Sequence, residues 1–166
     1  MSGRVTTRPR NPEPPPPHAL LGVGVIVLSV IEGEEHVLLG RHRNGTFDLP
    51  GGKAEPGEAL ERAAARELLE ETGLHTELDD VDVFALLVDD NRGVARLTAA
   101  ALVREFRGEP TAQPGEPYEN WAWTPLSNLP DGLFTPSGQV LRARWPHLPI
   151  DHPPTLQYAI RPADDL

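Results

Sequence analysis

The stretch from Gly52 to Leu74 constrains this chain more than any other part of its sequence. A loop over 44–53 (NGTFDLPGGK) is too rich in glycine and proline to be helical. The next segment, Ala59 to Thr72, consists of strong helix formers and ends at Gly73, a natural C-terminal cap. The sequence therefore predicts a tight turn that leads directly into a helix.

The predicted helix presents a group of carboxylates on one side. At about 100° per residue, three of its glutamates share an arc of about 100°, next to an apolar arc. They are Glu67, Glu70 and Glu71. Like charges at these spacings repel one another, and Mg²⁺ is the hard cation that such oxygen ligands suit. A solvated helix face is the common explanation for a glutamate-rich helix, but the turn at 49–52 favours a site, because glycine backbone can approach a metal or phosphate closely.

The residues of this stretch resemble the Nudix box. The matching positions are Gly52, Glu58, Arg66, Glu67, Leu68, Glu70, Glu71, Gly73 and Leu74. Seven positions of fixed identity would coincide by chance at on the order of 10⁻⁹ per start point. The resemblance covers about residues 20–145 and, through 38–41, 47–52 and 119–123, is closest to MutT-type nucleoside triphosphate diphosphatases.

The resemblance implies an α/β fold, the Nudix α/β/α sandwich with a mixed β-sheet. It also implies that water attacks a phosphorus of a diphosphate linkage with the help of two or more Mg²⁺ ions, for which Mn²⁺ is an alternative. By position, Glu67 and Glu71 look like metal ligands, and Glu70 looks like a further ligand or the base. The Gly51 carbonyl is expected to be another metal contact, and which glutamate removes the proton stays open.

Two neighbouring groups are predicted to support these carboxylates. Arg66 suits an ion pair that fixes a metal ligand, with Glu58 as its expected partner. Arg41, His42 and Arg43 end a predicted strand opposite the glycine loop. The two arginines there are candidates to bind the outer phosphates, on equal terms with a solvated basic turn.

A last group of candidates lies before the final predicted strand. Glu116 and Glu119 are weak candidates for one more metal ligand, because a glutamate in this region can serve as one in the family. Trp121 and Trp123 alternate with Ala122, which places both rings on one sheet face and favours core packing over base stacking.

The remaining segments complete a mixed α/β pattern. Strands are expected over Leu20–Val30, His36–Arg41, Val83–Asp89, Leu97–Arg107 and Trp121–Thr124, with a second helix over Ser137–Arg144 that is capped by Thr135. The domain is expected to span 18–146, between a proline-rich flexible tail over 1–17 and a C-terminal tail over 147–166. Deletion of 1–17 is expected to leave stability and turnover unchanged.

Composition limits the functional classes. The absence of cysteine excludes thiolate metal sites, a thiol nucleophile and the cysteine-dependent isomerases related to this family. A formal charge of −10 argues against binding of a nucleic-acid polymer, and no signal peptide or membrane span is expected. The sequence predicts a cytoplasmic monomer or homodimer that acts on a small nucleotide.

The expected reaction converts a nucleoside triphosphate, including modified or deoxy forms, to a monophosphate and pyrophosphate. The proline or tyrosine typical of relatives that act on ADP-ribose or diadenosine polyphosphates is absent from 89–92. Another nucleoside diphosphate-linked compound, such as ADP-ribose or a nucleotide sugar, is the alternative substrate. A non-catalytic nucleotide sensor is the alternative from another class, which the intact glutamate set disfavours. Base choice is expected to depend on 23–25, 96–98 and the last helix.

Overall fold

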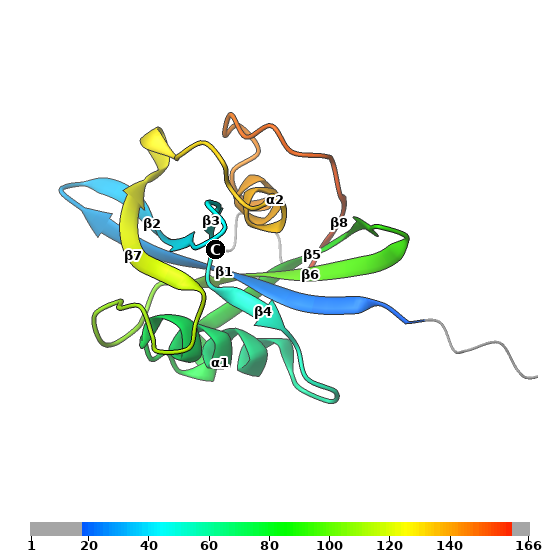
Figure 1. Cartoon of the computed structure of the whole chain (residues 1–166), viewed down its shortest axis with the longest axis horizontal. Helices are drawn as coiled ribbons and strands as arrows, with labels where there is room; N and C mark the ends of the chain where they lie inside the picture. The colour runs from blue at the N-terminus through cyan, green and yellow to red at the C-terminus, as the bar shows by residue number, and fades with distance from the viewer. Residues whose placement is uncertain (1–17, 161–166) are drawn as a thin grey trace, which may run out of the picture.

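A computed structural model describes residues 18–160, which form one mixed β-sheet with a helix on each face (Figure 1). The strands are β1 (Leu20–Ile31), β2 (Glu34–His42), β3 (Phe47–Asp48), β4 (Gly51–Lys53), β5 (Val81–Asn91), β6 (Val94–Val103), β7 (Tyr118–Pro125) and β8 (Leu156–Ala159). The helices are α1 (Leu60–Thr72) and α2 (Thr135–Arg144), with short 3₁₀ turns η1 (Leu78–Asp80) and η2 (Leu126–Asn128). The predicted α/β/α sandwich is confirmed.

Strand β1 organises the sheet, whose main order is β3-β2-β1-β6-β5-β8. Residues 20–27 of β1 pair in parallel with β6. On its other edge, residues 22–24 pair antiparallel with β4 and residues 28–31 pair antiparallel with β2. Strand β7 adds to the outer side of β2. A strand shared in this way must be apolar on both faces, and Val25, Ile26 and Val27 are all fully buried.

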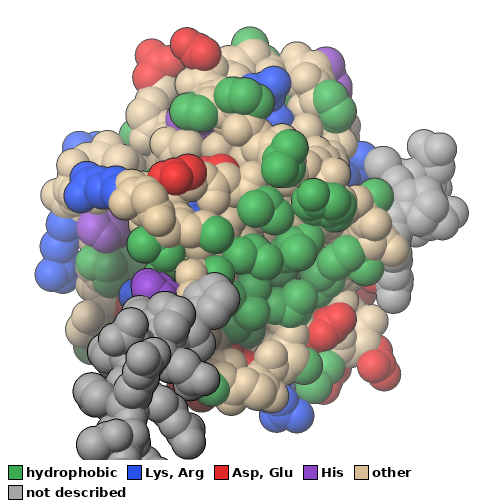
Figure 2. Space-filling view, turned by 90° about the vertical axis from the view of Figure 1, so that its right-hand side faces the viewer, with side chains coloured by type: hydrophobic (Ala, Val, Ile, Leu, Met, Phe, Trp, Pro, Cys, Tyr) green, Lys and Arg blue, Asp and Glu red, His purple; other side chains and the backbone are tan. Residues whose placement is uncertain are grey.

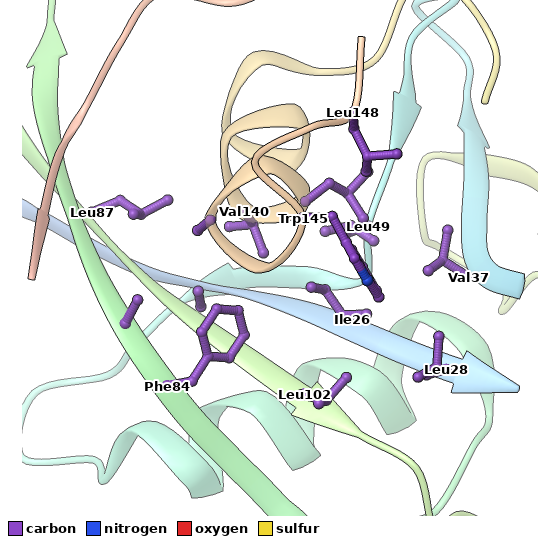
Figure 3. Close-up of a cluster of buried hydrophobic side chains, with 14 of the residues drawn as sticks. Ile26, Leu28, Val37, Leu49, Phe84, Leu87, Leu102, Val140, Trp145 and Leu148 are labelled. Carbon is purple, nitrogen blue, oxygen red and sulfur yellow. The ribbon is translucent and has the colours of Figure 1, made fainter. Parts of the chain in front are cut away.

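Two hydrophobic clusters lie on opposite sides of the sheet. On the α1 side, alternate residues of β1 and β6 pack against Ala63, Ala64 and Leu68 of the helix. On the α2 side, Ile26, Phe84 and Leu102 pack under Val140 and Trp145 (Figure 3). Helix α1 ends where Gly73 adopts a left-handed conformation (φ 77°) and donates its N–H to the Leu69 carbonyl, as its sequence predicts.

Several predicted element boundaries differ from those in the structure. Strand β6, predicted over Leu97–Arg107, ends at Val103 and does not reach Arg107, which forms only an isolated bridge with His75. The second helix begins at Thr135 itself, so its N-cap is Phe134 and no side chain caps it. The segment 147–160, predicted as part of a tail, buries Leu148 and contributes β8 to the sheet.

The expected proline-rich tail over 1–17 and the last residues, 161–166, lie outside the described residues. The domain boundary at 18 therefore stays a prediction, whereas the chain beyond 146 continues into the sheet through β8. Neither of the helices within 18–160 has the length and apolarity needed to cross a membrane.

Candidate active site

The glycine loop is held in place by backbone pairing on both sides. Gly51 and Lys53 of β4 pair with Gly24 and Gly22 of β1, and the Pro50 carbonyl accepts the Val25 N–H at 2.8 Å. A Cβ atom on Gly51 would lie 2.1 Å from the Val23 carbonyl oxygen, so only glycine permits this close approach. The loop therefore presents main-chain atoms to α1 at a fixed position.

Glu71 is the most deeply buried of the predicted carboxylates, with 6% exposure. Its Oε2 accepts the Gly51 N–H at 2.9 Å, and its main-chain carbonyl accepts the Trp121 indole N–H at 2.9 Å. Burial raises its pKa to about 8; the Gly51 hydrogen bond opposes this rise, and the charges of Glu67 and Glu116 add to it. The raised pKa favours the protonated acid in this position, and a nearby cation would favour the charged form.

Glu67 lies one helical turn earlier and faces Gly52. A Cβ atom on Gly52 would lie 2.3 Å from Glu67 Oε1, so the absence of a side chain makes room for the carboxylate. Burial raises the pKa of Glu67, and the adjacent Arg66 guanidinium partly opposes the rise. Glu67 and Glu71 therefore both face the glycine loop.

This close contact predicts the effect of adding one methyl group. Gly52→Ala is expected to displace the Glu67 carboxylate and lower turnover by about 10-fold or more, because catalysis is sensitive to displacements near 1 Å. Gly33→Ala is the control: φ there is 83° and no atom lies within 4 Å, so it should cost stability but not turnover. Steady-state kinetics and thermal melts of both variants measure the effects. Unchanged turnover in Gly52→Ala would contradict the assignment of Glu67.

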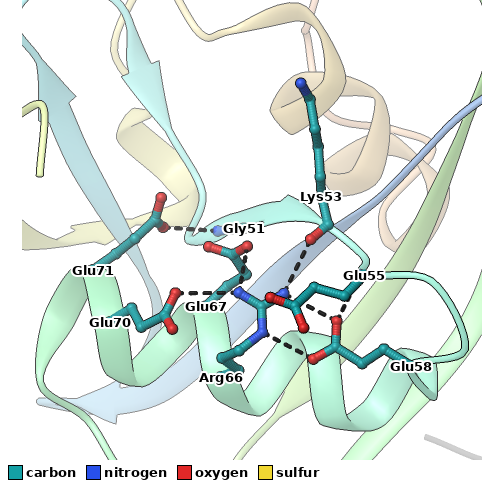
Figure 4. A network of polar contacts seen from close by, with 8 residues as sticks. All are labelled: Gly51, Lys53, Glu55, Glu58, Arg66, Glu67, Glu70 and Glu71. Atoms are coloured by element: carbon teal, nitrogen blue, oxygen red, sulfur yellow. Dashed lines mark hydrogen bonds and ion pairs between the residues drawn. The ribbon is translucent and has the colours of Figure 1, made fainter.

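Arg66 ties the carboxylates together (Figure 4). Its Nε donates to Glu58 at 2.8 Å, and its Nη1 donates to Glu67 at 2.9 Å and to Glu70 at 3.1 Å. Its Nη2 donates to the Lys53 carbonyl at 3.0 Å, which joins the helix to β4. The predicted ion pair with Glu58 is thus present, and Arg66 fixes the orientation of Glu67.

Glu58 is a charged anchor within this network. The Arg66 hydrogen bonds are the main cause that lowers its pKa to about 2, and the Glu55 N–H adds to the effect. Glu70 differs from Glu67 and Glu71 because half of its side chain is exposed, so it borders solvent. It is available to a bound substrate without being part of the buried pair.

The donor set fits a hard divalent cation. Within residues 18–160, no three carboxylate or imidazole groups already converge on one point. A cation beside Glu67 and Glu71 would thus take its other ligands from main-chain carbonyls, water and substrate phosphate, an environment that Mg²⁺ accepts readily. Gly51 donates its N–H to Glu71, and its carbonyl oxygen is the main-chain atom of this residue that can serve as a metal ligand.

The candidates outside the helix, Glu116, Glu119, Arg41 and Arg43, differ in how close they lie to Glu67 and Glu71. Glu119 forms an ion pair with Arg41 at 3.2 Å, and both side chains are more than half exposed. Glu116 instead lies close enough to Glu67 and Glu71 to raise their pKa values. This electrostatic proximity favours Glu116 over Glu119 as a further carboxylate of the site. Arg43 is exposed, and its backbone N–H donates to the Pro117 carbonyl.

A buried tyrosine beside the carboxylates was not predicted from the sequence. Tyr118 is 7% exposed and packs against His42 edge to face, with ring centroids 5.4 Å apart. Burial raises its pKa, and the charges of Glu71 and Asp48 raise it further, so its hydroxyl stays protonated. Asp48 is itself buried and accepts the Thr46 hydroxyl at 2.6 Å.

Parts of the segments predicted to select the base meet on the α2 side of the sheet, whereas Val23 and Val25 face α1. A Cβ on Gly24 would lie 3.0 Å from Val140, which closes that part to a ligand. Toward the start of β1, Arg96 and Asp89 form an ion pair, and the Gln139 amide donates to the same carboxylate at 3.4 Å. A polar cluster thus lies beside the first half of β1.

A cavity of about 860 Å³ lies elsewhere, at the opposite end of β2 from the carboxylates. It is lined by the β1–β2 turn, by η2 and by residues 145–152. None of the carboxylates described above borders it, so it does not mark the active site.

A mixed sheet between two helices, with a carboxylate-bearing helix packed behind a glycine turn, is the arrangement that the resemblance to the Nudix family implies. The Nudix domain model matches residues 20–143. The chain therefore belongs to the Nudix hydrolase family and is MutT-like.

The relatives and solved structures agree with this membership. The chain is 46% identical over 115 residues to an ADP-ribose pyrophosphatase from Methanocaldococcus jannaschii, covering 66% of each chain. It is 33% identical over 129 residues to the human 8-oxo-dGDP phosphatase NUDT18, covering 73% of this chain and 38% of the human one. A MutT Nudix hydrolase from Burkholderia pseudomallei superimposes with a TM-score of 0.65 at 27% identity, covering 75% of this chain and 97% of the other.

This chain covers only part of the length of several relatives. The chain spans 37% of a putative 8-oxo-dGTP diphosphatase from Bacillus subtilis and 56% of a MutT-like protein from Streptomyces ambofaciens. The names of these proteins therefore guide the choice of substrates to test and do not assign one.

Proposed function

We propose that this protein hydrolyses a nucleoside triphosphate to a nucleoside monophosphate and pyrophosphate in a reaction that depends on Mg²⁺. The observation that carries the proposal is the pair Glu67 and Glu71, buried against Gly51 and Gly52 with raised pKa values. Buried carboxylates close to one another favour a bound cation, and phosphate oxygens complete the coordination of Mg²⁺ well.

In this proposal, different residues bind the metal, orient its ligands and bind the outer phosphates. Glu67, Glu71 and the Gly51 carbonyl would hold Mg²⁺, with Glu70 and Glu116 at the margin; the bound ion would neutralise phosphate oxygens and help to activate water. Arg66 orients Glu67 and Glu70. Arg41 and Arg43, exposed near the end of β2, are candidates to bind the outer phosphates.

The proposed position of the nucleoside follows from strand register. Lys53 pairs with Gly22, which pairs with Thr98, and the Lys53 side chain points away from α1 (Figure 4). The polar cluster of Asp89, Arg96 and Gln139 occupies the same side of the sheet, one row further along. A nucleotide with its phosphates at β4 could thus place its base near hydrogen-bonding groups that discriminate between bases.

The bond cleaved tests this proposal. The full chain is incubated with Mg²⁺ and a panel of nucleotides in ¹⁸O-labelled water, and the products are separated by chromatography and weighed by mass spectrometry. We expect a monophosphate and pyrophosphate, with the label on only one of them, because water attacks within the α–β bridge. Release of orthophosphate from a triphosphate would exclude this cleavage pattern. Cleavage of ADP-ribose or nucleotide sugars alone would establish the alternative substrate class.

A further inference from the structure

An apolar row crosses the sheet on the α1 side beyond the end of that helix. Strand register places Leu156 of β8 beside Val88, Val88 beside Leu97, and Leu97 beside Leu21 of β1. Val88 shares a face with Leu86, which packs against the α1-side cluster, so the whole row faces that side. Leu156 is 64% exposed and Leu21 is 39% exposed, which shows that α1 does not cover this row.

The neighbouring row of side chains shows where α1 stops covering the sheet. Tyr158 lies beside Leu86, which pairs with Ala99, and Ala99 pairs with Val23. Ala99 and Val23 are buried under α1, whereas Tyr158 is 57% exposed and Ile160 beyond it is 52% exposed. The exposed members of these rows, together with the partly buried Val88 and Leu97, form what we term the apolar strip: Leu21, Val88, Leu97, Leu156, Tyr158 and Ile160. Figure 2 shows a broad hydrophobic area on this side of the molecule.

The strip continues to an open edge of the sheet. β8 is the outermost strand on its side, and in the part of the chain that the structure describes no strand pairs with its outer edge. Its residues and the next one, LQYAI, include no charge and no proline, which are the usual features that keep an edge strand from pairing.

We propose that the apolar strip and the β8 edge are the surface through which two copies of this chain associate. A two-fold axis brings the same strip and the same strand to both sides of the interface, so a single surface supplies its own complement. The chain carries a formal charge of −10, whereas the strip is uncharged. Two anionic copies meet with least repulsion there, and a nucleic acid or an anionic membrane has no positive group in the strip to bind.

The size of the strip sets the strength of the association. With the exposures given above, it offers on the order of 500 Å² of apolar surface per copy, or about 1,000 Å² for two. Specific interfaces begin near this size. The dimer should therefore be concentration-dependent, with a dissociation constant in the micromolar range.

Sedimentation velocity on the full chain, from low to high micromolar concentration, tests the proposal. The wild type should shift from monomer to dimer, and both Leu156→Asp and Leu21→Asp should remain monomeric. Two positions are needed because Leu156→Asp could loosen β8, whereas Leu21 lies on β1 at the other end of the row. Val30→Asp is the matched control, since Val30 is 66% exposed on β1 outside the strip and its replacement should leave the dimer intact.

Near-ultraviolet circular dichroism and thermal melts establish that each variant is folded. A wild type that stays monomeric throughout, or a dimer that persists in either folded strip variant, would overturn the proposal. Loss of the dimer in Val30→Asp as well would also overturn it, because the association would then respond to charge and not to this surface.

Discussion

Replacing Glu71 or Glu67 by Gln is expected to lower turnover by about 10²-fold or more while the protein stays folded. Glutamine keeps the size of the side chain and an oxygen that can still accept the Gly51 N–H. What it removes is the negative charge that would hold a cation. Both variants should therefore lose turnover, while the glycine loop keeps its geometry. Steady-state kinetics with Mg²⁺ and a cleaved nucleotide measure the effect.

The melting temperature of the same variants provides a second measurement. Without a cation, Glu71 is a buried acid close to the like charges of Glu67 and Glu116. Removing one member of such a set relieves repulsion and desolvation, so the metal-free variants should melt at the same temperature as the wild type or higher. Glu61→Gln, in the first turn of α1, is the control: it should leave turnover unchanged and, because it removes a favourable charge at the helix N-terminus, should not raise the melting temperature. Full turnover in both site variants would refute the assignment of the metal ligands.

The elements predicted correctly from the sequence are those whose own residues show a clear helix, strand or turn preference. β1 has an apolar run long enough for a strand buried on both faces, and α1 combines helix formers with a glycine cap. The hairpin of β5 and β6 turns at a polar segment that contains Arg92 with φ 56° and Gly93 with φ 85°. In each case the local preference and the tertiary structure agree.

The missed strands depend on distant partners. β3 and β4 lie in the segment that was predicted to be a loop, because residues such as Gly51 and Gly52 have low strand propensity. They are strands only because β1 and β2 already present open edges to them. β8 follows Pro153 and Pro154 and is fixed by pairing with β5. No short-range pattern contains this information.

The same distinction applies to the site. Helical spacing is sufficient to bring Glu67, Glu70 and Glu71 together, and Arg66 reaches its predicted partner Glu58. The contributions from β7 depend on a register shift between Arg41 and His42, where β2 pairs irregularly with β7. This irregularity accompanies the pairing of Glu119 with Arg41 and the burial of Tyr118, and it could not be predicted from spacing in the sequence.

In the absence of divalent cations, the protein should lose stability as the pH rises from about 4.5 to about 8. Glu71 has an ordinary pKa of 4.5 and a folded-state pKa of about 8. Between these values the folded state holds a proton that the unfolded chain has released, so each rise in pH favours unfolding. The raised pKa values of Glu67 and Asp48 act in the same direction. The lowered pKa of Glu58 acts below this interval and does not oppose the trend.

Mg²⁺ should reverse this dependence, because it binds the charged carboxylates of the folded protein and competes with the protons. Thermal melts across the pH interval, with a chelator or with Mg²⁺, measure both effects. We expect the chelated protein to lose roughly 5 °C or more toward the alkaline end, and Mg²⁺ to raise the melting temperature most there. Glu71→Gln should flatten the chelated profile, since the group with the largest shift no longer titrates. A profile that rises with pH in chelator, or a Mg²⁺ effect that is equal at both ends, would show that these carboxylates are neither protonated in the metal-free fold nor ligands of the cation.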